Sequence, residues 1–283
     1  MALPSYAGPL ERTWYYAYRL ICAAIFVFLV LPLFVIIPLS FNAEPYFTFT
    51  EGMLALDPDA YSLRWYQDFF TSDDWMHAIK NSFIIAIFST LLATILGTIA
   101  ALGLSRATMP FRAFFMGFLI SPMIVPLIIS AAAMYFFYSS VNLAQTYVGV
   151  VLAHTALGTP FVVITVTATL VGFDQSLIRA AHNLGASPTT TFFKIIMPLI
   201  LPGVISGGLF AFITSFDEVV VVLFLAGFDQ RTIPVQMWSG IREQISPTIL
   251  AVATILITIS ILLLTTLELL RRRNERLRGM TPG

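Results

Sequence analysis

Two adjacent carboxylic acids lie inside an otherwise apolar stretch of the sequence and are the residues best placed for chemistry. Asp217 and Glu218 follow Thr214 and Ser215 within residues 197–226, a segment long and apolar enough to cross a membrane. An ionised carboxylate at that depth costs at least about 2.5 kcal/mol unless it meets water or a partner. The pair is therefore a candidate for the path of a cation through the membrane, or alternatively a structural ion pair or hydrogen-bonding group.

Helical geometry separates the two acids. If the segment is one continuous helix, neighbouring residues point about 100° apart, so the two carboxylates cannot both face a path squarely. Glu218 then shares a face with Thr214 and Ser215, whereas Asp217 follows Ile213. We expect one acid to line the path and the other to support a helix.

Other kinds of chemistry lack suitable residues. His77, His154 and His182 are too scattered for a metal site, so each is expected to form local hydrogen bonds. The single cysteine, Cys22, excludes an intramolecular disulfide and is expected to be a small core residue. The sequence has no Gly-Lys-Ser/Thr phosphate loop, nucleophile elbow or metalloprotease signature. We therefore expect no enzyme, no metal and no cofactor in this chain, and energy from ATP must come through another subunit.

The composition places these residues in a membrane protein. Hydrophobic residues make up 58% of the 283 residues and charged residues only 11%, which is unlike a soluble globular domain. The net charge is zero, which gives no indication of a nucleic-acid partner. The sequence predicts an all-α polytopic protein with six transmembrane helices, at residues 15–41, 79–105, 111–138, 146–171, 197–226 and 247–270.

The basic residues predict the orientation of these spans. If the N-terminus is cytoplasmic, eleven of the 15 Lys and Arg residues lie inside: Arg12, Arg19, Arg106, Arg112, Arg179, Lys194, Arg271, Arg272, Arg273, Arg276 and Arg278. The outer loops then hold Arg64, Lys80, Arg231 and Arg242. This positive-inside bias predicts a multi-pass protein with both termini in the cytoplasm.

The first outer loop, residues 42–78, is acidic. Its acids are Glu44, Glu51, Asp57, Asp59, Asp68, Asp73 and Asp74. Such a surface can attract a cationic solute or a basic patch on a docking protein, or it can simply be a solvated loop.

Two sequence features bear on how the helices pack. Ala93, Gly97 and Ala101 recur at four-residue spacing, which favours close helix approach in lipid. Pro122, Pro126 and Pro160 fall within predicted spans, where they indicate kinks beside a path or purely structural kinks.

An amphipathic segment too polar to span lies between the fourth and fifth spans. Leu177, Ala180, Ala181 and Leu184 recur at helical spacing. Gly185 can end that helix, and Ser187-Pro188 suits the N-cap and first position of another. The sequence therefore predicts two short helices that meet at a glycine on the cytoplasmic face.

This segment resembles the coupling loop of ABC importer permeases of the binding-protein-dependent (MetI-like) superfamily. The family pattern is Glu-Ala-Ala, three residues, Gly, nine residues, Ile, one residue and Leu-Pro. The matching positions are Ala180, Ala181, Gly185, Ile195 and Pro198, while Arg179 stands where the family often has Glu and Met197 where it has Leu. The Arg puts a salt bridge from that position in doubt.

The resemblance extends over most of the chain and is strongest to the second permease of spermidine/putrescine-type transporters. It includes Ser62-Leu63-Arg64-Trp65-Tyr66 and Ser215-Phe216-Asp217-Glu218-Val219-Val220. It implies a MetI-like permease fold with cytoplasmic coupling helices: a single transmembrane permease domain over residues 1–283, with an N-terminal span at 15–41, core spans over 79–270, a coupling loop at 174–198 and a basic cytoplasmic tail at 271–283.

The resemblance also implies a function and partners. The chain would be the permease subunit of an ATP-driven importer in the bacterial inner membrane, paired with a second permease, two ATP-binding subunits that hold ATP and Mg²⁺, and a periplasmic substrate-binding protein. The coupling residues implied are Arg179, Ala180, Ala181, Leu184, Gly185, Ala186, Ile195 and Pro198. The cargo is putrescine or spermidine, or alternatively another amino compound such as an aminoalkylphosphonate, an opine or an amino-acid derivative.

Two other classes of protein remain as rivals. A secondary transporter would use Asp217 and Glu218 as ion-coupled carboxylates within an inverted repeat, but the two halves of the sequence show no such repeat. A membrane scaffold or sensor could use the amphipathic loop as a binding surface, but it would leave the intramembrane acids unexplained.

Overall fold

The chain is helical throughout the part that the computed structural model describes, namely residues 8–106, 108–174, 176–243 and 246–277. No β-strand occurs in these ranges, and the nearest feature is an isolated bridge between Asn42 and Tyr61. The expected all-α class is confirmed. Internal contacts divide the chain into two units, residues 1–72 with 240–283 and residues 73–239.

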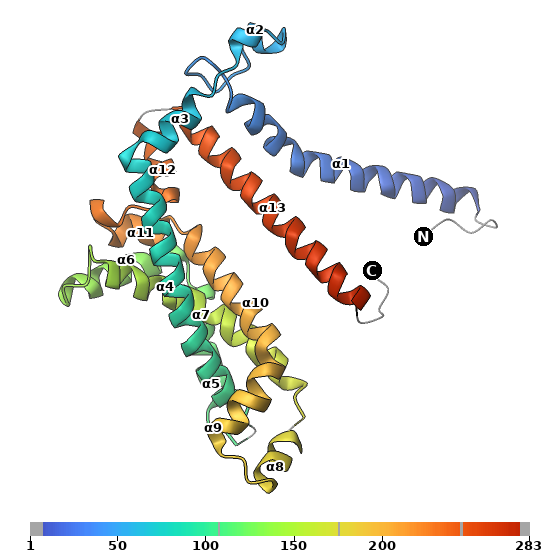
Figure 1. Cartoon of the computed structure of the whole chain (residues 1–283), viewed down its shortest axis with the longest axis vertical. Helices are drawn as coiled ribbons and strands as arrows, with labels where there is room; N and C mark the ends of the chain where they lie inside the picture. Colours follow the sequence, from blue (N-terminus) through green and yellow to red (C-terminus); the bar gives the residue numbers. More distant parts are fainter. Residues whose placement is uncertain (1–7, 107, 175, 244–245, 278–283) are drawn as a thin grey trace. The chain divides into compact units, whose positions relative to one another are not determined.

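The first unit contains the N-terminal helix, residues 40–72 of the segment that follows it, and the C-terminal helix. Its elements are α1 (Pro9–Leu39), α2 (Glu51–Leu54), η1 (Pro58–Ala60), α3 (Arg64–Thr71) and α13 (Thr248–Leu277) (Figure 1). The apolar middle of α1 is exposed, as a helix that faces lipid must be. Cys22 lies there and is exposed, so the expectation of a core cysteine was wrong. Residues 278–283, which include Arg278 and the end of the predicted basic tail, lie outside the described residues.

The second unit contains the remaining helices, of which three long ones pack together. Its elements are α4 (Asp73–Leu104), α5 (Arg112–Ile124), α6 (Leu127–Ser140), α7 (Tyr147–Val171), α8 (Ser176–Asn183), α9 (Pro188–Thr191), η2 (Phe192–Ile196), α10 (Met197–Phe216), α11 (Val220–Leu225), η3 (Phe228–Gln230) and the start of α12 (Ile233–Glu243). Helices α4, α7 and α10 lie side by side and form the centre of this unit (Figure 1).

Within the described residues, four helices have membrane-spanning length, or five if the bent pair α5 and α6 counts as one span, so the predicted count of six stays a prediction. In the described part of the chain, α1, α4, α7 and the helix from Pro188 to Phe216 are each long and apolar enough to cross a membrane. The predicted span 111–138 is two helices, α5 and α6, bent by 102°, so its continuity was wrong. Pro126 explains the bend, because proline lacks an N–H and disfavours helix at the residue before it. The sixth predicted span, 247–270, falls on α13.

Small residues bring the three central helices into close contact, as the spacing of Ala93, Gly97 and Ala101 predicted. All three are buried. A Cβ atom added at Gly97 would lie 2.7 Å from the Cβ of Val162 on α7, and one added at Gly207 of α10 would lie 2.7 Å from the Cα of Val162. Backbones can approach this closely only where a side chain is missing.

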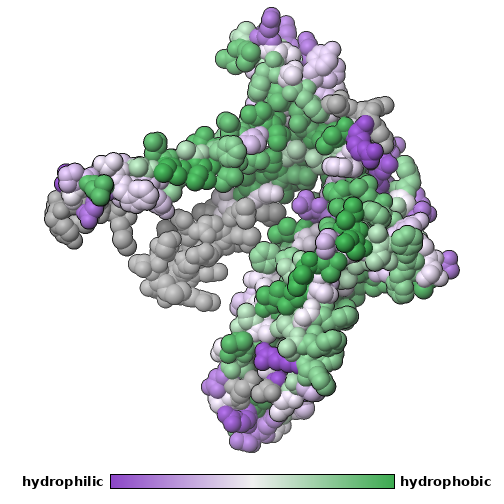
Figure 2. Space-filling view, turned by 180° about the vertical axis from the view of Figure 1, so that it is seen from behind, coloured by the Kyte–Doolittle hydropathy of each residue, from purple (hydrophilic) through white to green (hydrophobic). Residues whose placement is uncertain are grey.

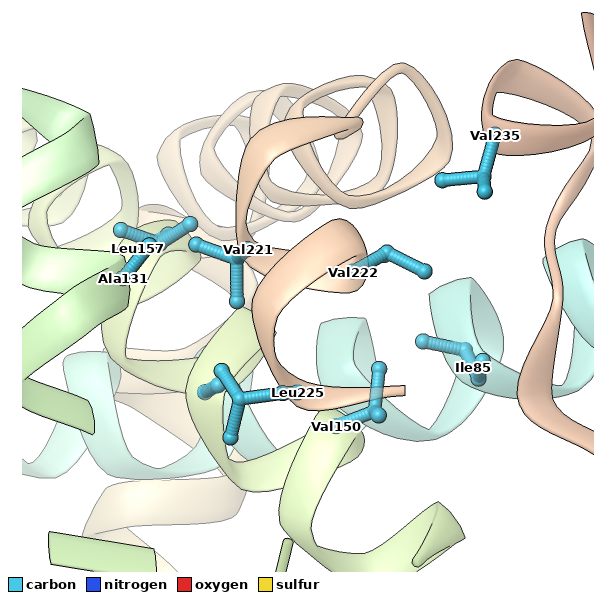
Figure 3. Packing of buried hydrophobic residues seen from close by; sticks show 9 residues of the cluster. Ile85, Ala131, Val150, Leu157, Val221, Val222, Leu225 and Val235 are labelled. Atoms are coloured by element: carbon cyan, nitrogen blue, oxygen red, sulfur yellow. The ribbon is translucent and has the colours of Figure 1, made fainter. Parts of the chain in front are cut away.

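Two apolar clusters hold the second unit together. One, drawn in Figure 3, joins α4, α6, α7, α11 and α12 through Ile85, Ala131, Val150, Ala153, Leu157, Val221, Val222, Leu225 and Val235. The other joins α4, α7 and α10 through Ala93, Ala101, Val162, Val166, Leu170, Ile200 and Ala211. The first cluster fixes α11, whose six residues are too few to form a stable helix without such packing.

We expect Gly207→Ala to destabilise the protein by about 1–3 kcal/mol, because the new methyl group overlaps the backbone of α7. Gly103→Ala in α4 is the matched control, since no atom lies within 4 Å of its added Cβ. The measurement is the thermal unfolding midpoint of the purified protein in detergent. Equal midpoints for the two variants would contradict this account of the contact.

Candidate functional site

Asp217 and Glu218 lie in a break between helices rather than inside one. Helix α10 ends at Phe216, and the N–H of Asp217 donates its last helical hydrogen bond to the carbonyl of Ile213 over 3.0 Å. Helix α11 begins at Val220. The expected continuous helix over 197–226 was therefore wrong, and so was the face it assigned to Glu218. The run of four valines, 219–222, directly follows the acids, and β-branched residues favour helix less than unbranched ones.

Glu218 has a structural role at this break. Its side chain is buried, and Oε1 accepts a hydrogen bond of 2.8 Å from the N–H of Val221 in the first turn of α11. A buried helix end needs such an acceptor because its first N–H groups have no partner within the helix. Asp217 is exposed. The two acids therefore differ in exposure: Glu218 is buried and supports the start of α11, whereas Asp217 is accessible.

The two hydroxyl residues upstream of the break also differ. Ser215 is buried, and its Oγ is hydrogen-bonded to Nδ1 of His154 on α7 over 2.8 Å. Thr214 is half-buried. Asp217 and Thr214 are therefore the accessible members of the predicted set. His154 was missed as their neighbour because 61 residues separate it from Ser215, and no local spacing relates the two.

Two histidines form the local hydrogen bonds that the sequence predicted. His154 binds Ser215, and Nε2 of His77 is 2.8 Å from the carbonyl oxygen of Asp229. Asn81 and Tyr147 donate to the same carbonyl, which fastens the loop at η3 to α4 and α7. Among the described residues no group of three or more His, Cys, Asp or Glu side chains is arranged to hold a metal.

The residue before the exposed acid belongs to a group of contacting aromatic rings. Phe216, which precedes Asp217, contacts Phe83 of α4 edge to face and Phe212 face to face, with centroids 5.4 and 5.7 Å apart. Phe83 is about half exposed. Ring faces attract ammonium groups, so an exposed acid that follows such a ring in the chain is compatible with an organic cation. With 25 Phe in the chain, composition alone could not single out these three.

The acidic outer loop uses some of its carboxylates in its own fold. Asp57 accepts from the N–H of Asp59 over 3.1 Å, and Asp68 accepts from the hydroxyl of Thr248 over 2.7 Å. Glu44 and Glu51 line an open depression of about 610 Å³ together with Asp57 and Asp59. Both interpretations of this loop, a docking surface and a solvated loop, therefore remain.

The segment between α7 and α10 has the predicted turn. Helix α8 ends in a Schellman motif, in which the N–H of Ala186 donates to the carbonyl of Ala181 and the N–H of Gly185 donates to that of His182, both over 3.0 Å. Gly185 has the positive φ of 79° that this motif requires. Ser187 then caps the next helix, and Pro188 occupies its first turn.

The second helix of this segment is not short, which corrects the sequence prediction. It starts at Pro188 and continues through η2 and α10 to Phe216 as one 29-residue helix. We call residues 188–216 the α9–α10 rod. At 1.5 Å per residue the rod is about 43 Å long and joins the glycine turn to the acidic break. The rod contains a π-helical turn at Phe192–Ile196, which includes Lys194. This turn accommodates one extra residue without interrupting the rod.

The apolar face of α8 is exposed rather than packed. Leu184 is 88% exposed and Leu177 is 42% exposed. Ala180 and Arg179 are also exposed, whereas Ala181 is buried against the chain. Ala186 and Ile195 are half-buried, and Pro198 is exposed. Hydrophilic residues cover this end of the unit, in contrast to the apolar surface of the central helices (Figure 2).

Asp174 supports the start of α8, a role that the sequence analysis missed. The hydroxyl and N–H of Ser176 donate to its two carboxylate oxygens over 2.6 and 2.8 Å. These hydrogen bonds, with a smaller contribution from the charge of Arg179, lower the pKa of Asp174. The sequence did contain a signal for this capping role, because Asp174 lies two residues before Ser176 at the start of an amphipathic segment.

We expect Glu218→Ala to lower the thermal unfolding midpoint of the purified protein, because α11 loses its cap at a cost of about 1–2 kcal/mol. Glu218→Gln keeps an oxygen that can accept from the N–H of Val221 and should unfold close to the wild type. Equal losses for both variants would mean that the negative charge, and not the cap, is what matters.

Comparison with known proteins agrees with this arrangement. A family model described as the binding-protein-dependent transport system inner membrane component matches residues 93–276. The chain is 32% identical to the spermidine/putrescine transport system permease protein PotC of Haemophilus influenzae, over 89% of this chain and 95% of that protein. It is also 32% identical to the putrescine transport system permease protein PotI of Escherichia coli, over 82% of each.

A solved structure shares the fold at low sequence identity. A bacterial ABC transporter involved in the import of the acidic polysaccharide alginate contains a chain that superposes with a TM-score of 0.75 and 13% identity, over 94% of this chain and 99% of that one. The fold is therefore the MetI-like fold of ABC transporter permeases. With helices of membrane-spanning length and a family model that covers most of the sequence, the chain belongs to the family of binding-protein-dependent transport system inner membrane components.

Proposed function

We propose that this chain is the permease subunit through which an ATP-driven importer passes putrescine, spermidine or a similar polyamine. The observation that carries the proposal is the exposed Asp217, which lies in a helix break directly after Phe216, whose ring contacts that of Phe83. The similarity to PotC and PotI supports the same class of cargo. A polyamine carries several ammonium groups, which lose water more readily next to carboxylates and aromatic faces.

The partners follow from the same proposal. The whole chain acts as one permease domain, pairs with a second permease and binds two ATPase subunits, which hold ATP and Mg²⁺. A periplasmic binding protein delivers the cargo to the outer face. The excess of basic residues in the inner segments supports cytoplasmic termini and a cytoplasmic coupling loop at residues 174–198.

The coupling loop suits the transmission of the ATPase stroke. Leu184 and Leu177 offer an exposed apolar surface on α8, which docking into a cleft of the ATPase would cover. The Schellman turn at Gly185 connects this surface to the α9–α10 rod. Because the rod is one helix up to Phe216, motion at the loop is carried to the break that holds Asp217. In this alternating-access mechanism, ATP binding moves the coupling helices and changes which side of the membrane the break faces.

A charge on α8 tests the docking surface. We expect Leu184→Asp to reduce both uptake and binding-protein-stimulated ATP hydrolysis by at least about tenfold, because burying this leucine is worth about 1.5–3 kcal/mol. Leu10→Asp in the first turn of α1, before the predicted first span, is the matched control, since that leucine is 83% exposed. The assay uses the complete transporter in proteoliposomes. Normal coupling in Leu184→Asp at a normal membrane level would refute this role.

Replacing the exposed acid tests the cation path. We expect Asp217→Asn to lower the maximal uptake rate of radiolabelled putrescine or spermidine about tenfold, the equivalent of about 1.4 kcal/mol. Stimulated ATP hydrolysis should persist, because the α9–α10 rod is intact, and Asp217→Glu should keep most of the uptake.

Two results would count against the proposed cargo. One is a wild-type uptake rate in Asp217→Asn. The other is weak binding of every polyamine by the partner binding protein, measured by calorimetry against a panel of polyamines and other amino compounds. Tight binding of an aminoalkylphosphonate, an opine or an amino-acid derivative in that panel would replace the polyamine as cargo.

A further inference from the structure

A buried polar contact ties α7 to the last turn of α10. Nδ1 of His154 and Oγ of Ser215 are 2.8 Å apart, and the two side chains are only 1% and 5% exposed. Their surroundings are apolar, since Val150, Ala153 and Leu157 on the same stretch of α7 belong to the cluster in Figure 3. A hydrogen-bonded pair in such a place needs an explanation, because an apolar pair of similar volume would pack there without desolvating polar atoms.

The surroundings of His154 indicate which nitrogen carries the proton. Nε2 is buried and has no hydrogen-bond partner within the part of the chain that the structure describes. An unpaired N–H in an apolar core costs more than an unpaired acceptor. We therefore assign the proton to Nδ1, which then donates to the hydroxyl oxygen of Ser215.

This contact and the Glu218 cap hold the acidic break from its two sides. Ser215 is two residues before Asp217, and Glu218 binds the N–H of Val221 just after it. Asp217 lies between these two anchors and is exposed. A rotation of the end of α10 by one residue would turn Ser215 away from His154 by about 100° and would turn Asp217 by the same angle. The hydrogen bond thus selects one orientation of the turn.

We propose that His154 is a positioning residue for cargo passage, which acts through Ser215 to fix where the carboxylate of Asp217 lies. The inference rests on the proposed function, in which Asp217 meets the cation. It adds a residue on another helix, α7, whose side chain is only 1% exposed.

Two amide side chains separate the roles of the imidazole nitrogens. The amide N–H₂ of Asn lies near the position of Nδ1, whereas that of Gln lies near the position of Nε2. In proteoliposomes with the complete transporter, we expect His154→Asn to keep the maximal uptake rate within about twofold. His154→Gln, His154→Leu and Ser215→Ala should each reduce it about fivefold, the effect of one hydrogen bond. The double variant His154→Leu/Ser215→Ala should be no slower than either single variant.

A second measurement reports on the turn independently of the cargo. Because Cys22 is the only cysteine, Cys22→Ser/Asp217→Cys carries one thiol at the break. Its rate of modification by a cationic methanethiosulfonate reagent is measured on this chain within the assembled transporter. Adding His154→Gln or His154→Leu should change that rate about fivefold, whereas adding His154→Asn should leave it within about twofold.

The two measurements keep the inference separate from the proposed function. A wild-type uptake rate in Asp217→Asn refutes the cation path, whatever His154 does. Suppose that Asp217→Asn is impaired, but His154→Gln and His154→Leu match His154→Asn in uptake or in labelling. His154 is then not a positioning residue. Additive losses of uptake in the double variant His154→Leu/Ser215→Ala also refute the positioning role. The membrane levels of all variants are compared, so that poor insertion is not mistaken for a defect in transport.

Discussion

The close approach of α4, α7 and α10 is the constraint on which the rest of the second unit depends. Helices in lipid gain little from hydrophobic association, so they must fit backbone against backbone. Gly97 and Gly207 both face Val162, where an added Cβ would meet α7 at 2.7 Å. This contact brings His154 within hydrogen-bonding distance of Ser215 and sets the position of the acidic break. A wider separation of α7 and α10 would leave both polar side chains buried without partners.

The break itself follows from a second constraint, the need to satisfy backbone groups away from water. A helix that stops at membrane depth exposes N–H and C=O groups that have no water to bind. Glu218 provides an acceptor for the start of α11, and the apolar cluster around Val221 and Leu225 holds that short helix in place. One acid is thus used to stabilise the break, and the break leaves the other acid, Asp217, accessible.

The α9–α10 rod connects the glycine turn after α8 to the acidic break. Its N-terminus follows the Schellman turn at Gly185, and its C-terminus is Phe216, next to Asp217. A single helix is stiff along its axis, so displacement at one end is carried to the other. The exposed Leu177 and Leu184 thus lie just before one end of the rod, and the exposed Asp217 lies just after the other, so the rod joins the proposed coupling surface to the proposed path residue.

The sequence by itself determined the helical class, the approximate extent of the spans, the small-residue contact face and the glycine turn before Ser187-Pro188. These properties depend on residues close to one another in the chain, through helical periodicity, backbone conformation and capping. Only the tertiary structure decided that α10 stops at Phe216, that Glu218 is buried while Asp217 is exposed, and that Ser215 pairs with His154. Those outcomes depend on which helices touch, and contacts between residues 61 apart leave no periodic trace in a single sequence.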